Sequence, residues 1–491
     1  MKKKIGSVLF SITLLSGVSC SQNISENNEY KFLVEKTKTF VKSNDIDGFS
    51  VAIFTKDSII WKNCTGETST KQKINENTLF SIQSVSKNIT ATAVMIAVQE
   101  GLIDLNKPVI EYLPELNLNS CFEENPENKI TLHMILSHTA GFAHEAPIGN
   151  NYDFSFNTNE EHLQSINNTW MKLPVGKDYF YSNNGFDLAA QIIEKVTGIP
   201  FNDYLKKKIF EPIGMESTTI DNNEILNNLN KTCGKISGAV KTKFYKTPLI
   251  GSGAVYTNLS DYIKYVQFEM NWGKLNQKQL VEPNYLLDMF TIRFNNYGLG
   301  TYIGNDNKLF YINHNGAGFG YSSTMLWFPE YEIGCVVMCT NQTYCFPLAF
   351  EISSEFIKNN KLPKVNSEVI DKFIAANKNY FNNPELINNV KLEPCSGDTI
   401  FNNEWKKYTG TYKIVLGGAE YKWFSKLAFK LGYIAYKMKV IEKNDKLYIS
   451  GYFGVSMLRE YKPGIFFTQN NDVLDFTKIS PRFKNIELEK K

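Results

Sequence analysis

The feature that most constrains this sequence is a serine and a lysine that stand three residues apart at the start of an apolar segment. Ser84 and Lys87 belong to the stretch 80–87. The segment 89–98 that follows consists of Ile, Ala, Val and Met with two threonines. Such a segment is typical of a buried helix. Because residues three apart lie on one helical face, the lysine amine is within reach of the serine hydroxyl. The sequence therefore predicts a nucleophilic serine with its own base.

The position of this pair favours catalysis further. Ser-x-x-Lys arises easily by chance, yet 84–87 is its single occurrence in the 491 residues. The N–H groups and partial positive charge of a helix start favour a developing oxyanion and, together with burial, lower the pKa of Lys87 toward that of a useful base. The alternative interpretation is a helix-capping serine beside a solvated lysine.

A second candidate is Tyr181-Ser182-Asn183, in a polar loop that enters the apolar helix predicted over 185–195. Tyr-x-Asn recurs elsewhere in this chain, so its context selects this copy. A phenol at this position can relay a proton, and Asn183 can orient Lys87 or a substrate amide. A turn tyrosine beside a capping asparagine is the structural alternative.

The third candidate is a glycine-rich stretch, 314–320, at the end of a predicted strand. His314, Asn315 and Gly316 begin it, and His-x-Gly occurs once in the sequence. Glycines let a substrate approach the strand edge. There the backbone N–H of Ala317 is expected to complete an oxyanion hole with the N–H of Ser84. His314 is expected to contact substrate, although a lone histidine is also often structural.

These motifs follow one another in a recognisable order: Ser84-x-x-Lys87, Tyr181-x-Asn183 and His314-x-Gly316. In that order they resemble the serine beta-lactamase and penicillin-binding-protein superfamily, in particular its branch of class C beta-lactamases, D-aminopeptidases, DD-peptidases and related esterases. The similarity extends to 136–141 and 297–300. The resemblance implies an α/β (α+β) fold, with an antiparallel sheet of five or more strands flanked by helices and a mostly helical lobe.

The same resemblance implies a covalent acyl-serine intermediate. Ser84 attacks a carbonyl carbon, Lys87 with Tyr181 removes its proton, and Tyr181 then protonates the leaving group and activates water. Which of the two residues is the base stays open at this stage. His138 is predicted to hold a helix–loop junction and to take no catalytic role. The sequence predicts no cofactor and no metal site.

The third motif departs from the beta-lactamase pattern. Those enzymes usually have Lys-Thr-Gly or Lys-Ser-Gly, whose ammonium and hydroxyl help to hold a substrate carboxylate, whereas this chain has His314 and Asn315. A histidine of ordinary pKa is mostly neutral at pH 7. The sequence thus favours a peptide, D-amino-acid amide or small ester as substrate. The alternatives are a beta-lactamase or penicillin-binding DD-peptidase, and a catalytically weak cell-envelope binding protein, which has no need of Ser84, Lys87 and Tyr181 together.

The N-terminus predicts export. Three lysines at 2–4 precede an apolar run, 5–18, that is too short to span a bilayer comfortably, so residues 1–19 are typical of a signal peptide. Cys20 after Ser19 resembles the lipidated cysteine of bacterial lipoproteins, although Gly17 stands where leucine is usual, and ordinary cleavage also fits. We expect a periplasmic or outer-envelope protein, anchored by a lipid on Cys20.

Removal of this segment balances the charges. The chain has 53 Lys and Arg against 50 Asp and Glu, and the three excess cations are those at 2–4. A near-neutral protein gives no reason to expect a nucleic-acid partner. The expected partner is a small-molecule or peptide acyl substrate, and the oligomeric state stays open.

The remaining sequence divides into a hydrolase domain over 28–360, a linker over 361–400 and a small antiparallel β-barrel over 401–491. Helices are predicted over 28–44, 185–195, 259–270 and 346–357, and strands over 50–55, 59–61, 309–313, 322–328 and 333–340. The stretch 408–412 resembles the lipocalin-like domain of many superfamily members. Five aromatic residues are predicted to fill the barrel core: Trp423, Tyr433, Tyr452, Phe466 and Phe467.

The cysteines predict no disulfide framework. Seven remain after Cys20, an odd number for complete pairing. Cys335 and Cys339 lie in an apolar strand pattern, so we expect them to be buried core thiols.

Overall fold

The computed structural model describes residues 30–149, 158–236, 240–241, 247–275, 278–306, 308–383, 394–415, 437–451 and 453–491. The predicted signal peptide with Cys20 lies outside these residues, and so do Trp423, Tyr433 and Tyr452. None of the helices described has both the length and the apolar character needed to cross a membrane.

A six-stranded antiparallel sheet forms the centre of the larger domain, in the order β2-β1-β12-β11-β10-β9. The five strands predicted from the sequence all belong to it, and β9 was not predicted. The strands β11 and β12 are buried along their whole length, which explains their uninterrupted apolar sequence. The strands are β1 (Gly48–Thr55), β2 (Ile59–Gly66), β9 (Tyr302–Asp306), β10 (Leu309–Gly318), β11 (Tyr321–Phe328) and β12 (Ile333–Cys339).

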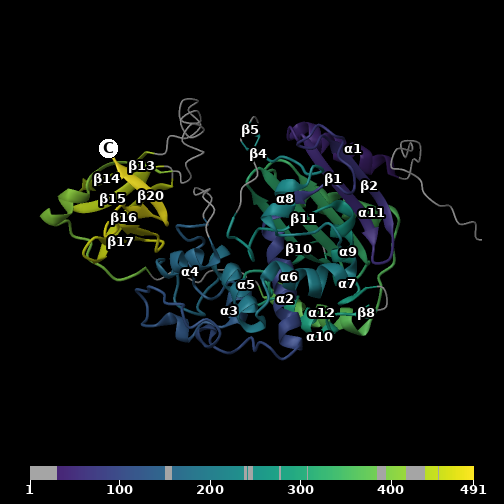
Figure 1. Ribbon diagram of the computed structural model, residues 1–491, viewed down its shortest axis with the longest axis horizontal. Coiled ribbons are helices and arrows are strands. Elements are labelled where there is room, and N and C mark those ends of the chain that lie inside the picture. The colour runs from purple at the N-terminus through teal and green to yellow at the C-terminus, as the bar shows by residue number, and fades with distance from the viewer. Residues whose placement is uncertain are drawn as a thin grey trace, which may run out of the picture.

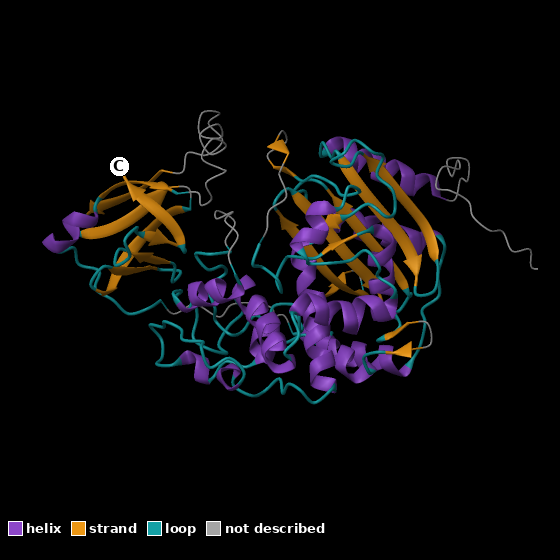
Figure 2. Cartoon of the chain, in the orientation of Figure 1, coloured by secondary structure: helices purple, strands orange, loops and turns teal. Residues whose placement is uncertain are grey.

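Helices cover both faces of this sheet (Figures 1 and 2). The helices α1 (Lys31–Ser43) and α11 (Phe346–Asn359) pack together on one face. On the opposite face lie α9 (Leu259–Met270) and α2 (Ser86–Gln99), whose residues belong to the largest apolar core. Nearly all of α2 is buried, as its apolar sequence predicts.

A mostly helical lobe lies beside the sheet, on the side of the barrel (Figure 2). Its helix α5 packs against α2 and α3 and ends at Gly198, whose φ of 67° suits glycine. This contact places the N-terminus of α5 next to the start of α2. The helices on this side are α3 (Leu132–Leu136), α4 (Asn159–Asn167) and α5 (Asn183–Thr197). The short helices α6 (Phe201–Leu205) and α7 (Glu211–Ile213) continue from α5 toward α9, and α8 (Asn222–Asn227) lies in front of the sheet (Figure 1).

Part of the segment expected to be a linker is helical. The helix α12 (Glu368–Asn382) buries Ile370 and Phe373 in the main core and packs against α10 (Pro283–Met289). The asparagine-rich composition near its C-terminus obscured the helical spacing of these apolar residues. The residues 368–382 therefore belong to the body of the larger domain.

The C-terminal strands form a closed antiparallel barrel. Its interior contains Trp405, Tyr412 and Phe466, so the predicted aromatic core is confirmed for Phe466, while Phe467 is also buried. The barrel strands are β13 (Gly410–Ile414), β14 (Lys437–Lys443), β15 (Lys446–Gly451), β16 (Gly454–Lys462), β17 (Ile465–Thr468), β18 (Val473–Asp475), β19 (Arg482–Phe483) and β20 (Ile486–Lys490).

One disulfide corrects the expectation drawn from the cysteines. Cys121 in the helical lobe is bonded to Cys395, which precedes the barrel, across 274 residues of sequence. An odd count forbids complete pairing but allows a single bond, and the distant partners gave no spacing signal. Cys335 and Cys339 are buried and outside this bond, as predicted.

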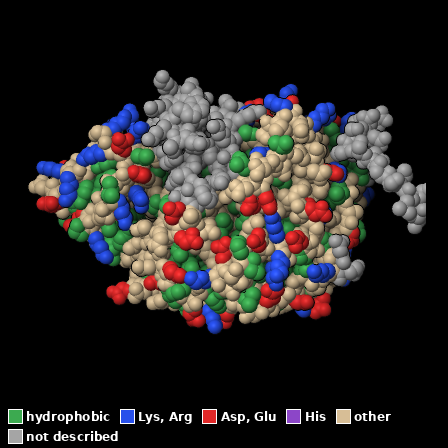
Figure 3. Space-filling view, viewed as in Figure 1, with side chains coloured by type: hydrophobic (Ala, Val, Ile, Leu, Met, Phe, Trp, Pro, Cys, Tyr) green, Lys and Arg blue, Asp and Glu red, His purple; other side chains and the backbone are tan. Residues whose placement is uncertain are grey.

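The surface agrees with the balanced charge of the sequence. On the face shown in Figure 3, basic and acidic side chains are interspersed over the helical lobe and the sheet domain. Interspersed charges of both signs give this face no strong field of a single sign.

Candidate active site

Ser84 lies in a tight turn that leads directly into α2. A 3₁₀ turn, Gln83–Val85, precedes the helix, so the serine stands at its start as predicted. Gln83 has a φ of 50°, a conformation unfavourable for a residue with a side chain. The Ser86 hydroxyl donates to the Gln83 carbonyl over 2.6 Å and the Ser323 hydroxyl donates to the Ile82 carbonyl over 2.7 Å. These bonds hold the strained turn.

Lys87 is fully buried and donates to three acceptors. Its Nζ lies 2.7 Å from Asn183 Oδ1, 2.8 Å from the Ser252 carbonyl oxygen and 3.2 Å from Ser84 Oγ. A neutral amine has two N–H bonds and one lone pair. When the two shorter bonds go to Asn183 and Ser252, the lone pair points toward the Ser84 hydroxyl.

The surroundings of Lys87 bring its pKa close to neutrality. Burial lowers the pKa to about 7, and the negative charges of Asp187 and Glu145 oppose part of that shift. A substantial fraction of this lysine is therefore unprotonated at neutral pH, which a general base requires.

Asp187, which was not predicted as a site residue, supports Lys87 from α5. This buried carboxylate accepts from the backbone N–H groups of Ser252, over 2.9 Å, and Gly251, over 3.1 Å. Its other oxygen lies 3.1 Å from His162 Nε2. Asp187 thus fixes the loop whose carbonyl binds Lys87. An acidic residue within the apolar helix pattern of 185–195 was the signal available in the sequence.

Tyr181 completes the group around the serine. The neighbouring Ser84 side chain opposes part of the rise in the pKa of its phenol, and the centre of its ring lies 4.8 Å from Lys87 Nζ. Burial raises the pKa of Tyr181 well above its usual value, so the phenol is protonated at neutral pH. Of the two candidate bases, Lys87 is the one with a pKa near neutrality.

His138 holds this tyrosine in place. Its ring lies 4.3 Å from that of Tyr181, and its Nδ1 accepts from the Ser182 backbone N–H over 3.2 Å. Burial holds the pKa of His138 well below its usual range. The residue contacts the helix–loop junction, in line with the structural role predicted for it.

A loop that contains His144 and Glu145 lies against the start of α5, and neither residue was predicted. The Asn183 amide donates to Glu145 Oε1 over 3.3 Å, and the Asn183 backbone N–H donates to the His144 carbonyl over 2.8 Å. His144 Nδ1 lies 3.1 Å from the Tyr181 carbonyl oxygen. The loop therefore braces both Tyr181 and Asn183.

His314 lies on β10, opposite Tyr181, and is fully buried. Its Nε2 lies 3.0 Å from the Tyr297 hydroxyl and its Nδ1 lies 2.9 Å from the Asn315 carbonyl oxygen. Burial, with the nearby Lys87 charge, lowers the pKa of His314 to about 3. The imidazole is therefore neutral at pH 7.

The end of β10 lies against the turn that carries Ser84. A Cβ on Gly316 would stand 2.1 Å from the Ile82 carbonyl oxygen, and one on Gly318 would stand 2.6 Å from Gln83 Oε1. Glycine at these positions permits the close approach. Ala317 is exposed between them, at the strand position predicted for the oxyanion hole. The Asn315 side chain is held by the Thr324 hydroxyl, over 2.8 Å.

A cavity of about 520 Å³ opens beside Tyr181 and His314. Among its lining residues, all of which the structure describes, none carries a charge at pH 7, because His314 is neutral. Five aromatic rings and three amide side chains supply most of the wall. These residues are Tyr181, Tyr302, Tyr311, Tyr344, Phe346, Asn296, Asn313 and Asn315.

The fold and this arrangement define a class of protein: a serine hydrolase scaffold with a Ser–Lys pair, a tyrosine and a strand edge around one cleft. The model of the Beta-lactamase family matches residues 33–348, and the chain belongs to that family. The family is part of the serine hydrolase superfamily that includes the penicillin-binding proteins.

Several known proteins are similar to this chain. Protein flp of Staphylococcus aureus (strain MRSA252) is 24% identical over 340 residues, which are 67% of this chain and 66% of that protein. The chain thus matches slightly less than two thirds of that protein's length. Penicillin-binding protein 4* of Bacillus subtilis (strain 168) is 24% identical over 62% of this chain and 71% of its own.

A solved structure has the same fold over nearly the whole chain. The octameric penicillin-binding protein homologue from Pyrococcus abyssi superposes with a TM-score of 0.57 at 18% identity, covering 96% of this chain and 99% of that one. The shared coverage includes the C-terminal barrel.

Proposed function

We propose that this protein is an exported serine hydrolase that forms an acyl intermediate on Ser84. The observation that carries the proposal is the arrangement around Lys87, whose two short hydrogen bonds direct its lone pair toward the Ser84 hydroxyl. A pKa of about 7 makes the neutral amine available at physiological pH. A solvated lysine beside a capping serine has neither property.

In the acylation step, Lys87 takes the proton of Ser84 as Oγ attacks the carbonyl carbon. The negative charge that develops on the carbonyl oxygen is stabilised by the backbone N–H groups of Ser84 and Ala317. As the bond to the leaving group breaks, Tyr181 gives its proton to that group and takes the proton held by Lys87. The lysine is then neutral again, and Tyr181 is again protonated.

Deacylation uses the same groups in reverse. A water molecule gives its proton to Lys87 through the Tyr181 hydroxyl as its oxygen attacks the acyl carbon. When the ester bond breaks, Ser84 Oγ recovers a proton from Lys87. Asn183 holds the lysine through both steps, which keeps the transfer distances short.

The cavity indicates which acyl compounds fit. A carboxylate moved from water into an uncharged, aromatic wall loses solvation without gaining a cation. His314, the nearest counterpart of the lysine usual in beta-lactamases, is neutral and already bonded to Tyr297. We infer that the preferred substrate is an ester or amide, including a peptide or D-amino-acid amide, that places an uncharged apolar or aromatic group in this cavity.

A matched pair of esters tests this preference. We expect 4-nitrophenyl hexanoate to be hydrolysed with a kcat/KM at least about tenfold higher than that of mono-4-nitrophenyl adipate, in which a carboxylate replaces the terminal methyl group. The reason is that an unpaired buried charge costs more than about 1.4 kcal/mol. Spontaneous hydrolysis of both esters serves as the control. Equal kcat/KM values would contradict the proposal.

The second candidate is a beta-lactamase or penicillin-binding DD-peptidase, which the similarity to Penicillin-binding protein 4* favours. Turnover of nitrocefin at an ordinary enzyme rate would select it over the ester or amide hydrolase.

Export is supported by the basic and apolar N-terminal segment and by the disulfide, since stable disulfides are typical of oxidising compartments. We further propose lipid attachment to Cys20. When the protein is expressed in a bacterial host supplied with labelled palmitate, we expect the label in the wild type and not in Cys20→Ala. Equal labelling of both proteins would contradict this attachment site.

A further inference from the structure

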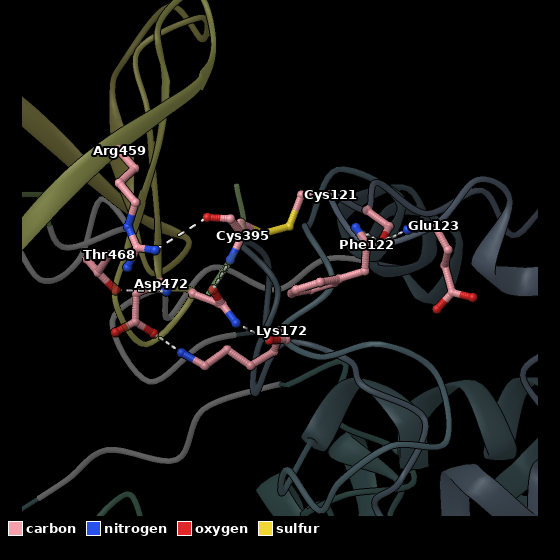
Figure 4. The surroundings of a disulfide bond; sticks show 10 residues. Cys121, Phe122, Glu123, Lys172, Cys395, Arg459, Thr468 and Asp472 are labelled. Carbon is pink, nitrogen blue, oxygen red and sulfur yellow. Dashed lines mark hydrogen bonds and ion pairs between the residues drawn. A yellow bond between two sulfur atoms is a disulfide. The ribbon is translucent and has the colours of Figure 1, made fainter. Parts of the chain in front are cut away.

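The barrel is joined to the helical lobe by a disulfide that is itself held in place. Cys121 and Cys395 have their Cα atoms 6.0 Å apart, within the usual range. The buried Cys395 donates its backbone N–H to Asn471 Oδ1 over 2.9 Å, and Arg459 donates to the Cys395 carbonyl over 3.4 Å (Figure 4). The backbone of Cys395 is therefore hydrogen-bonded both to the turn between β17 and β18 and to β16.

A largely buried ion pair lies beside the disulfide. Lys172 of the lobe pairs with Asp472 of the barrel (Figure 4). The Lys484 ammonium lies 2.9 Å from the second carboxylate oxygen of Asp472. The side chains of Lys172 and Asp472 are 9% and 14% exposed. A pair in such surroundings is costly to separate. Nearby, the Trp170 ring packs edge-on against Phe467, 5.5 Å away.

A second contact reaches the catalytic group. Lys484 and Asn485 form the two-residue turn between β19 and β20, with φ angles of 51° and 65°. Lys484 forms an ion pair with Asp472. The Asn485 side-chain amide donates a hydrogen bond to the Glu145 carbonyl over 2.8 Å. The turn thus touches the loop that braces α5.

From Glu145 the contacts continue to the nucleophile. The Glu145 carboxylate accepts from Asn183, whose Oδ1 accepts from Lys87 Nζ, and Lys87 contacts Ser84. The Glu145 side chain is only 11% exposed, so its charge acts on Lys87 with little screening by water.

We propose that the barrel is a positioning element of the active site: Asn485 fixes the loop 142–147, and Glu145 in turn orients Asn183 and Lys87. Asn485 and Glu145 are positioning residues, since they act through Asn183 and Lys87. The predicted effect on catalysis rests on the proposed function. The predicted effect on the order of the loop 142–147 does not depend on that function.

The charged and titratable groups that face Lys87 come from several elements. Asp187 of α5 and the loop residue Glu145 raise the pKa of Lys87 by their charges. The imidazoles of His138 and His314 are neutral, and the Tyr181 phenol is protonated. Removal of the Glu145 charge, or its exposure to water, therefore lowers the pKa of Lys87.

Three variants test the proposal. Asn485→Gly removes the amide but keeps a residue that tolerates a positive φ, so the turn is preserved. Glu145→Gln removes the charge at nearly constant shape. The matched control is Lys478→Ala, because Lys478 makes an exposed contact between the same barrel and lobe, 3.5 Å from Asn168 Oδ1.

Hydrogen–deuterium exchange supplies a readout that needs no substrate. We expect faster exchange in Asn485→Gly for peptides covering 142–147 and 181–185, where the Asn183 N–H is bonded to His144. The control is expected to exchange as the wild type does. Unchanged exchange in Asn485→Gly overturns the proposal even if the enzyme proves inactive on every ester.

The second readout is the pH dependence of Ser84 labelling by a fluorophosphonate. Glu145→Gln is expected to shift the midpoint to lower pH, and Asn485→Gly to shift it in the same direction by less, with a maximal rate lowered about tenfold. Wild-type midpoints and rates in both variants overturn the proposal. Absence of labelling in the wild type contradicts the proposed function instead, and the exchange result still decides this inference.

Discussion

Replacing Lys87 by methionine is expected to lower kcat/KM for 4-nitrophenyl hexanoate by about 10³–10⁴-fold, because the variant keeps the buried shape but removes the only amine in contact with the Ser84 hydroxyl among the described residues. Steady-state kinetics at pH 8 measure the effect. Lys264→Met is the control, since this half-exposed lysine of α9 contacts the Gly214 carbonyl and not the site. A loss smaller than tenfold in Lys87→Met would contradict the assignment of the base.

The same lysine predicts the pH profile of the wild type. The base acts in its neutral form, so the rate of acylation falls as Lys87 gains a proton. With a pKa of about 7, the rate is expected to be about tenfold lower at pH 6 than on the plateau above pH 8. A profile that keeps rising to pH 10, as for an ordinary lysine, is incompatible with this description of the site.

Replacing Tyr181 by phenylalanine is expected to lower kcat by about 10²–10⁴-fold and to make the acyl-enzyme accumulate. The ring still packs on His138, but the relay between Lys87 and the leaving group or water is lost. Rapid mixing with 4-nitrophenyl hexanoate should show a burst of one equivalent followed by slow turnover.

Tyr179→Phe is the matched control for that experiment. Tyr179 lies on the same loop, and its hydroxyl bonds to the Tyr302 hydroxyl over 3.1 Å rather than to Ser84. Its removal is expected to change kcat by less than about tenfold. Equal losses in the two variants would show that the loop, and not the Tyr181 hydroxyl, carries the effect.

Much of the fold follows from local sequence patterns. The five predicted strands are apolar runs bounded by turns, and the helix 259–270 agrees with α9 residue for residue. The strand β9 was missed because Tyr302–Asp306 is short and contains a glycine. The helix α12 was missed because asparagines near its C-terminus resemble a linker.

The candidate site likewise contains residues that sequence motifs predict and residues that they do not. Ser84, Lys87, Tyr181 and Asn183 belong to motifs, and the structure brings them together. Glu145 and the Ser252 carbonyl reach Lys87 from loops without a motif. Asn485 lies 340 residues from Glu145. Contacts of this kind depend on tertiary packing, which local periodicity does not encode.

The most direct test is the mass of the intact protein after brief exposure to 4-nitrophenyl hexanoate, followed by peptide mapping. The account predicts an added hexanoyl group on the peptide that contains Ser84, formed in the wild type, accumulated in Tyr181→Phe and absent from Ser84→Ala. An adduct of the same mass that persists in Ser84→Ala, or one that maps to another residue, would contradict the central claim that Ser84 is the nucleophile.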